Sequence, residues 1–86
     1  MRDQLSIEAY RDLGKAALTA KQDAVFDLLL TKGPLSNREI SEALGWPINT
    51  VTPRVKELRD QGFVASAGIQ KVDATHRWEH VWEVST

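Results

Sequence analysis

Residues 35–64 constrain the fold of this chain more than any other segment, because glycines divide them into two short helices and the start of a strand. Ser36 can cap the first helix, and Glu39 follows at the spacing of a capping box. Gly45 ends that helix, since a residue with left-handed backbone angles is least costly as glycine. Gly62 ends the second helix. Two helices joined by a tight, glycine-containing turn form a helix-turn-helix unit.

Apolar residues recur at helical spacing in both helices. The first helix carries Ile40, Ala43 and Leu44 on one face, and the second carries Val51, Val55 and Leu58. A stripe of this width is typical of a helix that packs one side on a core. We therefore expect the opposite sides of both helices to face solvent or a partner.

Pro53 conflicts with a long second helix, because proline lacks an N–H group and disfavours helical backbone angles at Thr52. If the helix begins near Asn49, Pro53 falls at the edge of the first turn. If it begins at Pro47, a plausible first helical residue, Pro53 lies in mid-helix and kinks it. We expect the later start or a local distortion.

Two more helices are predicted before this unit. Ser6 caps a helix over residues 6–18, which either packs on the core or serves as a dimerisation arm. Thr19 caps the next helix, which ends at Gly33 and Pro34, and Leu35 can add a strand stub beside a hairpin. We divide the chain into an N-terminal helical extension, residues 1–18, and a domain over residues 19–86.

After Gly62 the apolar period changes from 3.6 to 2, which is typical of strands. The alternating residues are Phe63, Ala65, Ala67 and Ile69 in the first run, and Trp78, His80, Trp82 and Val84 in the second. Residues 71–76 form a polar turn between two antiparallel strands. The tryptophans Trp46, Trp78 and Trp82 are interpreted as core side chains, although the neighbouring turn leaves Trp78 open to exposure. The predicted fold is α+β, a three-helix core with a C-terminal hairpin.

Composition bounds the function. The 86 residues make one domain with a net charge of -1 and no cysteine, so neither a disulfide nor a thiolate metal site is expected. No apolar run is long enough for a membrane span, and we expect a cytoplasmic protein. Residues 46–77 hold five basic and three acidic side chains, the only basic surplus in the chain. That surplus is a weak electrostatic footprint for nucleic acid.

The order of elements resembles the winged helix-turn-helix domains of MarR-like regulators. The resemblance is nearest to small winged-helix proteins of phages and prophages. It covers residues 19–84 and rests on the pattern Glu39-Ile40, Leu44-Gly45-Trp46, Asn49, Val51, Pro53-Arg54-Val55, Glu57-Leu58, Gly62 and Val64. The resemblance implies a winged helix that binds double-stranded DNA as a transcriptional regulator. Residues 1–18 are shorter than the dimerisation helices of MarR proteins, so a homodimer through this segment stays a hypothesis.

In a helix-turn-helix the second helix lies in the major groove and its first residues meet base edges. We predict a DNA-binding set of Asn49, Thr50, Thr52, Pro53, Arg54, Lys56, Arg59, Lys71, His76 and Arg77. Asn49 has the donor and acceptor pair for an adenine edge, although it can equally be a helix cap. The cations suit phosphates, or guanine for Arg54, although they can equally form a solvated face.

No catalytic motif is present, so we expect no enzyme activity. No cofactor or metal is expected either, since His76 and His80 are four residues apart on a strand, roughly 13 Å. The alternative to DNA binding is a winged helix that binds protein. The nearly neutral charge favours this alternative, because nonspecific DNA affinity comes largely from phosphate neutralisation.

Overall fold

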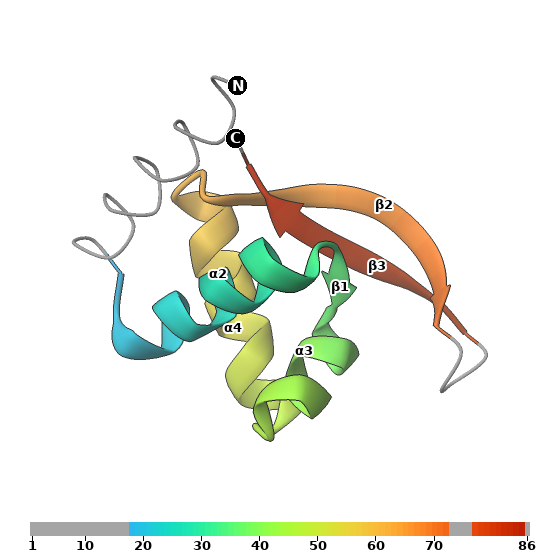
Figure 1. The fold of residues 1–86 in the computed structure, drawn as a ribbon, viewed down its shortest axis with the longest axis horizontal. Coiled ribbons are helices and arrows are strands. Elements are labelled where there is room, and N and C mark those ends of the chain that lie inside the picture. Colours follow the sequence, from blue (N-terminus) through green and yellow to red (C-terminus); the bar gives the residue numbers. More distant parts are fainter. Residues whose placement is uncertain (1–17, 73–76, 86) are drawn as a thin grey trace.

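The computed structural model describes residues 18–72 and 77–85. Three helices stand against one sheet in these residues, and a long hairpin projects beyond the helices (Figure 1). The elements are α2 Ala20–Lys32, β1 Leu35–Ser36, α3 Asn37–Leu44, α4 Ile48–Asp60, β2 Val64–Val72 and β3 Arg77–Val84. The expected helix over residues 6–18 lies outside the described residues apart from Leu18, and so does the turn at residues 73–76.

Local sequence rules account for the ends of the first two helices. Thr19 accepts a hydrogen bond from the Gln22 N–H, and Gln22 closes the reciprocal bond of a capping box at the start of α2. Ser36 and Glu39 form the same arrangement at the start of α3. Gly45 follows α3 with φ 70°, a left-handed conformation that glycine adopts at low cost. The predicted caps at Thr19, Ser36 and Gly45 are confirmed.

One core holds the domain together. The buried apolar side chains come from all three helices and two strands: Val25, Phe26, Leu29, Ile40, Val51, Val55, Leu58, Val64 and Trp82. Phe63 closes the core beside α2, with its ring edge-on to Phe26 at 5.9 Å. The predicted stripe of α4 is fully confirmed, whereas Ala43 of the α3 stripe is exposed.

The three strands form an antiparallel sheet in the order β1-β3-β2. The predicted stub is confirmed, since Leu35 pairs with Trp82 and Ser36 with Val81. In the hairpin the register shifts between Ser66 and Ile69, where Gly68 has φ 101°. This architecture is a winged helix, and we call the β2–β3 hairpin the wing.

The register shift between Ser66 and Ile69 is a β-bulge, and the alternation predicted for β2 is wrong beyond it. Val64 is buried, whereas Ile69, which belongs to the expected apolar series, is 61% exposed. One extra residue enters the strand at the bulge, so the expected apolar series changes side there. Ile69 then lies on the same side of the sheet as the buried Val64 and Trp82, and it is exposed because it lies further along the wing. The core interpretation of Trp78 is also wrong, since its side chain is 70% exposed, while Trp82 is buried and Trp46 half-buried.

Candidate nucleic-acid interface

The side of α4 that faces away from the core is polar and exposed. Asn49, Thr52, Pro53 and Lys56 all lie exposed on it. This placement follows from the spacing of the helix, since Val51, Val55 and Leu58 occupy the opposite side and are buried. These four predicted residues are therefore brought together on one surface.

The N-terminal end of α4 is not closed by a side chain. Pro47 is the N-cap residue, with φ -61° and ψ 147°, and it makes no side-chain cap hydrogen bond. Asn49 is therefore not the cap, which overturns one of its two interpretations. The helix starts at Ile48 and contains Pro53. Because proline has no N–H, the Asn49 carbonyl lacks its usual donor four residues on.

Arg54 does not project from this surface as a free cation. Its Nε donates to Glu57 Oε1 at 2.9 Å and its Nη2 donates to Glu57 Oε2 at 2.8 Å. Gln22 of α2 also donates to Glu57 Oε1, at 2.7 Å. The hydrogen bond from Arg54, and then the one from Gln22, hold the pKa of the Glu57 carboxyl below its usual value. The same bond raises the pKa of Arg54.

The other two cations of α4 also have partners within the chain. Lys56 Nζ lies 2.9 Å from Asp60 Oδ2. The Arg59 guanidinium lies over the Trp82 ring at 4.5 Å from the ring centroid. The spacings of Arg54 with Glu57 and of Lys56 with Asp60 are those at which helical side chains meet. For these cations, a bound phosphate competes with partners that they already have within the chain.

The wing carries the remaining predicted cations. Lys71 and Arg77 are exposed near its far end, whereas His76 lies outside the described residues. His80 stacks on Trp82 with ring centroids 4.6 Å apart and planes inclined by 5°. Its Nε2 is 2.8 Å from Ser66 Oγ. The base of the wing is thus tied to α4 through Trp82, on which Arg59 also rests.

A groove of about 280 Å³ separates the wing from the two helices of the helix-turn-helix. Its walls include Arg38 of α3, Ile48 of α4 and His80 of β3. Sequence reasoning missed Arg38 and Ile48. Ile48 had a visible signal, because it is apolar and lies outside the buried stripe of α4, and its side chain is 48% exposed. Arg38 had no such signal, because its ion pair with Glu79, at 3.3 Å, joins distant parts of the sequence.

The described residues also lack two other kinds of feature. No group of three or more histidine, aspartate or glutamate side chains gathers there in a way that would hold a metal ion. Within the same residues, no helix has the length and apolar character that crossing a membrane requires.

Residues 24–65 match a family model described as winged helix-turn-helix DNA-binding. These residues run from α2 through α3 and α4 to the start of β2. No curated protein sequence matches the chain significantly.

Several solved structures have the same fold, and they are MarR-family regulators. A mutant of ZitR from Lactococcus lactis superimposes with a TM-score of 0.62 and 26% identity, covering 79% of this chain and 43% of that one. The adhesin competence repressor AdcR from Streptococcus pyogenes superimposes with a TM-score of 0.60 and 25% identity, covering 98% of this chain and 61% of that one. Reduced AbfR bound to DNA superimposes with a TM-score of 0.64 and 23% identity, covering 96% of this chain and 58% of that one. The chain thus spans less than two thirds of the length of these relatives.

Proposed function

We propose that this winged helix-turn-helix chain binds double-stranded DNA in a sequence-specific manner and acts as a transcriptional regulator. The observation that carries the proposal is the exposed polar face of α4, with Asn49, Thr52 and Lys56 on a helix whose other side is wholly buried. The match of residues 24–65 to a DNA-binding family supports it. So does the fold shared with AbfR, which has been solved bound to DNA.

The α4 helix enters the major groove with its first turn against the base edges. The Asn49 side-chain amide donates to N7 of an adenine and accepts from the N6 amino group of the same base. Ile48 and Thr52, one turn apart, offer methyl groups to thymine. Pro53 carries no donor, so it shapes this surface without reading a base. Thr50 is half-buried and lies at the margin of the contact.

The cations position the helix instead of reading sequence. Lys56 and Arg59 turn to phosphates at the edge of the groove, and Lys71 and Arg77 reach the backbone from the wing. Arg54 contributes through the N–H groups that Glu57 does not use, because Glu57 accepts only from Nε and from one hydrogen of Nη2. The chain therefore relies on base contacts more than on phosphate neutralisation, and its binding has a shallow dependence on salt.

The test compares Asn49→Ala with Lys56→Ala by titration against a duplex selected from a random pool by the wild type. Asn49→Ala should cost about 1–3 kcal/mol on that duplex and flatten discrimination at one base position. Lys56→Ala should weaken all sequences alike and lower the salt slope by about one unit. Failure of the wild type to prefer any duplex over random DNA at low salt contradicts the proposal.

A second candidate function is a protein-binding module. The pairing of Arg54, Lys56 and Arg59 within the chain favours it, because paired cations attract phosphate less strongly. The same titration separates the two functions, since a protein module gives no sequence preference.

We also propose that the regulator is a homodimer that works in the cytoplasm without cofactor or catalytic activity. Two half-sites multiply the modest affinity of one small winged helix, and residues 6–18 are the proposed contact. Sedimentation of the full chain and of a chain lacking residues 1–17 tests this. A monomeric full chain at high micromolar concentration, with and without DNA, contradicts it.

A further inference from the structure

The two faces of the wing differ in chemistry. Directly paired residues of antiparallel strands project to the same side of the sheet. The register therefore places Ser66, Ile69, Lys71, Trp78, His80 and Trp82 on one side, here named the Trp78 face. Both carboxylates of the described strands, Glu79 and Glu83, pair with Gln70 and Ala65 on the opposite side. The Trp78 face is thus aromatic and cationic and bears no carboxylate in its described part.

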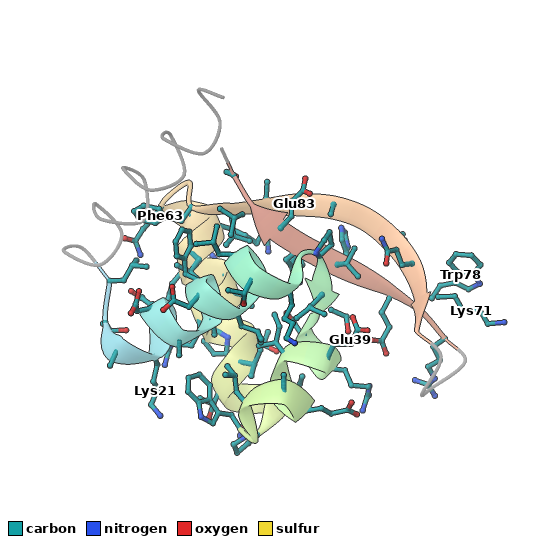
Figure 2. The ribbon with its side chains drawn as sticks, in the orientation of Figure 1. Lys21, Glu39, Phe63, Lys71, Trp78 and Glu83 are labelled. Atoms are coloured by element: carbon teal, nitrogen blue, oxygen red, sulfur yellow. The ribbon has the colours of Figure 1, made fainter. Side chains whose placement is uncertain are left out.

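The outer part of this face is apolar but does not belong to the core. Trp78 is 70% exposed and Ile69 is 61% exposed, the two largest values among the large apolar side chains described. Figure 2 shows Trp78 and Lys71 together at the far end of the wing, beyond the helices. A tryptophan held away from the core exposes a large apolar surface, which is typical of a contact site.

The inner part of the face fixes this end relative to α4. Trp82 is buried in the core and carries both the His80 ring and the Arg59 guanidinium. His80 also lines the groove that Ile48 borders at the first turn of α4. Because the face is continuous from α4 to Trp78, a molecule bound along α4 meets Trp78 next.

We propose that Trp78, with Ile69 beside it, is an apolar wedge that enters the minor groove next to the site bound by α4 and bends the duplex there. The proposal rests on the DNA-binding function proposed above. Lys71 lies directly across from Trp78 and holds the adjacent phosphate. The Glu79 carboxylate, which lines the groove beside His80, is ion-paired with Arg38, so the charge along this path still favours a polyanion over a protein surface of mixed charge. Apolar side chains that enter a base step unstack it and bend the duplex.

The experiment uses the full chain and an end-labelled duplex selected by the wild type, with bending followed by energy transfer between the ends. Trp78→Ala should lose the bend and bind roughly tenfold more weakly, as expected for loss of one aromatic–base contact. Trp78→Phe should keep part of both effects. Glu83→Gln, an exposed change on the opposite face, should leave the bend unchanged and alter affinity by less than about twofold.

The outcomes separate this inference from the proposed function. A Trp78→Ala protein that melts, binds and bends DNA like the wild type overturns the wedge. In that case the DNA-binding function still stands if Asn49→Ala loses discrimination between sequences. If Trp78→Ala leaves DNA binding unchanged but weakens self-association in sedimentation, the face is a protein contact and the wedge is again overturned. A wild type that prefers no duplex overturns both.

Discussion

The two helices of the helix-turn-helix begin in opposite ways. At the start of α3, Ser36 Oγ accepts from the Glu39 N–H at 3.1 Å and the Glu39 carboxylate accepts from the Ser36 N–H at 2.9 Å. At the start of α4, Pro47 provides no side-chain cap. Inside α4, Pro53 removes one more helical donor. Helix α3 is thus stabilised by local hydrogen bonds, whereas α4 depends on its buried side.

This difference fits the proposed function, in which α3 has a structural task and α4 contacts DNA. Capping groups satisfy the first N–H groups of a helix and so withdraw them from any partner. In the first turn of α4 the Thr50 N–H donates to the Pro47 carbonyl at 2.9 Å, so the N–H groups before it are the ones left to an external acceptor, and the Asn49 side chain is exposed beside them. Stability that local capping does not supply comes from Val51, Val55 and Leu58.

The largest expected effect tests whether α4 depends on its buried side. Val55 is 1% exposed, so Val55→Asp places an unpaired carboxylate in the core. This change costs on the order of several kcal/mol, out of a total stability of about 5–15 kcal/mol for a domain. Circular dichroism should show an unfolded protein at room temperature, with Lys56→Ala as the folded control. A cooperatively melting Val55→Asp protein shows that the buried side of α4 is wrongly assigned.

The next effect concerns the proline inside α4. Pro53→Ala restores an N–H opposite the Asn49 carbonyl, and should raise the free energy of unfolding by about 1–3 kcal/mol in urea titrations. The matched control is Pro47→Ala, where φ already suits proline. It should lower stability by about 0.4–1 kcal/mol, because the unfolded chain gains freedom. Changes of the same sign at both positions contradict this distinction.

A smaller effect is expected from loss of the α3 cap. Ser36→Ala should lower the free energy of unfolding by about 1 kcal/mol. Asn49→Ala in the first turn of α4 should change thermal stability by less than about 0.5 kcal/mol, because Asn49 caps nothing. If both variants melt at the same lowered temperature, the contrast between the two helix starts is wrong.

The smallest effect is a pH dependence at the junction of α2 and α4. The pKa of Glu57 is lowered in the folded protein by the hydrogen bonds from Arg54 and Gln22. Its contribution to stability is therefore present above the pKa of the unfolded chain and is lost as the pH falls through the lowered value. Melting temperatures measured from neutral pH to below about pH 4 should fall more for the wild type than for Glu57→Gln. Parallel profiles contradict this role of Glu57.

Features that depend on neighbours in the sequence were predictable. Thr19, Ser36, Gly33 and Gly45 mark the ends of α2 and α3 because capping involves residues only a few positions apart. The buried stripe of α4 followed from helical spacing alone. The ion pairs of Arg54 and Lys56 had the right spacing, but the sequence does not say whether a helical cation pairs within its own helix or projects toward a ligand.

Features that depend on distant segments were not predictable. The neighbouring turn left Trp78 open to exposure, but whether Trp78 and Ile69 are covered depends on how far the helices extend along the sheet, and the bulge at Gly68 shifts the apolar series of β2. The contact of Arg38 with Glu79 and the stacking of Arg59 on Trp82 also join distant positions. For the candidate interface, the face of α4 was therefore predictable, whereas its charge pairing and the chemistry of the wing were not.

The short strand β1 also bears on the order of folding. Leu35 and Ser36 pair with Trp82 and Val81, so the whole helix-turn-helix and most of the hairpin lie in the loop that this pairing closes. Closing a long loop loses chain entropy before any contact compensates for it, and such contacts slow the folding of small domains. On the ribosome, the residues of α2, α3 and α4 are therefore synthesised before the partner of β1. The sheet, and with it the burial of Trp82, is established only after residue 82 has been synthesised.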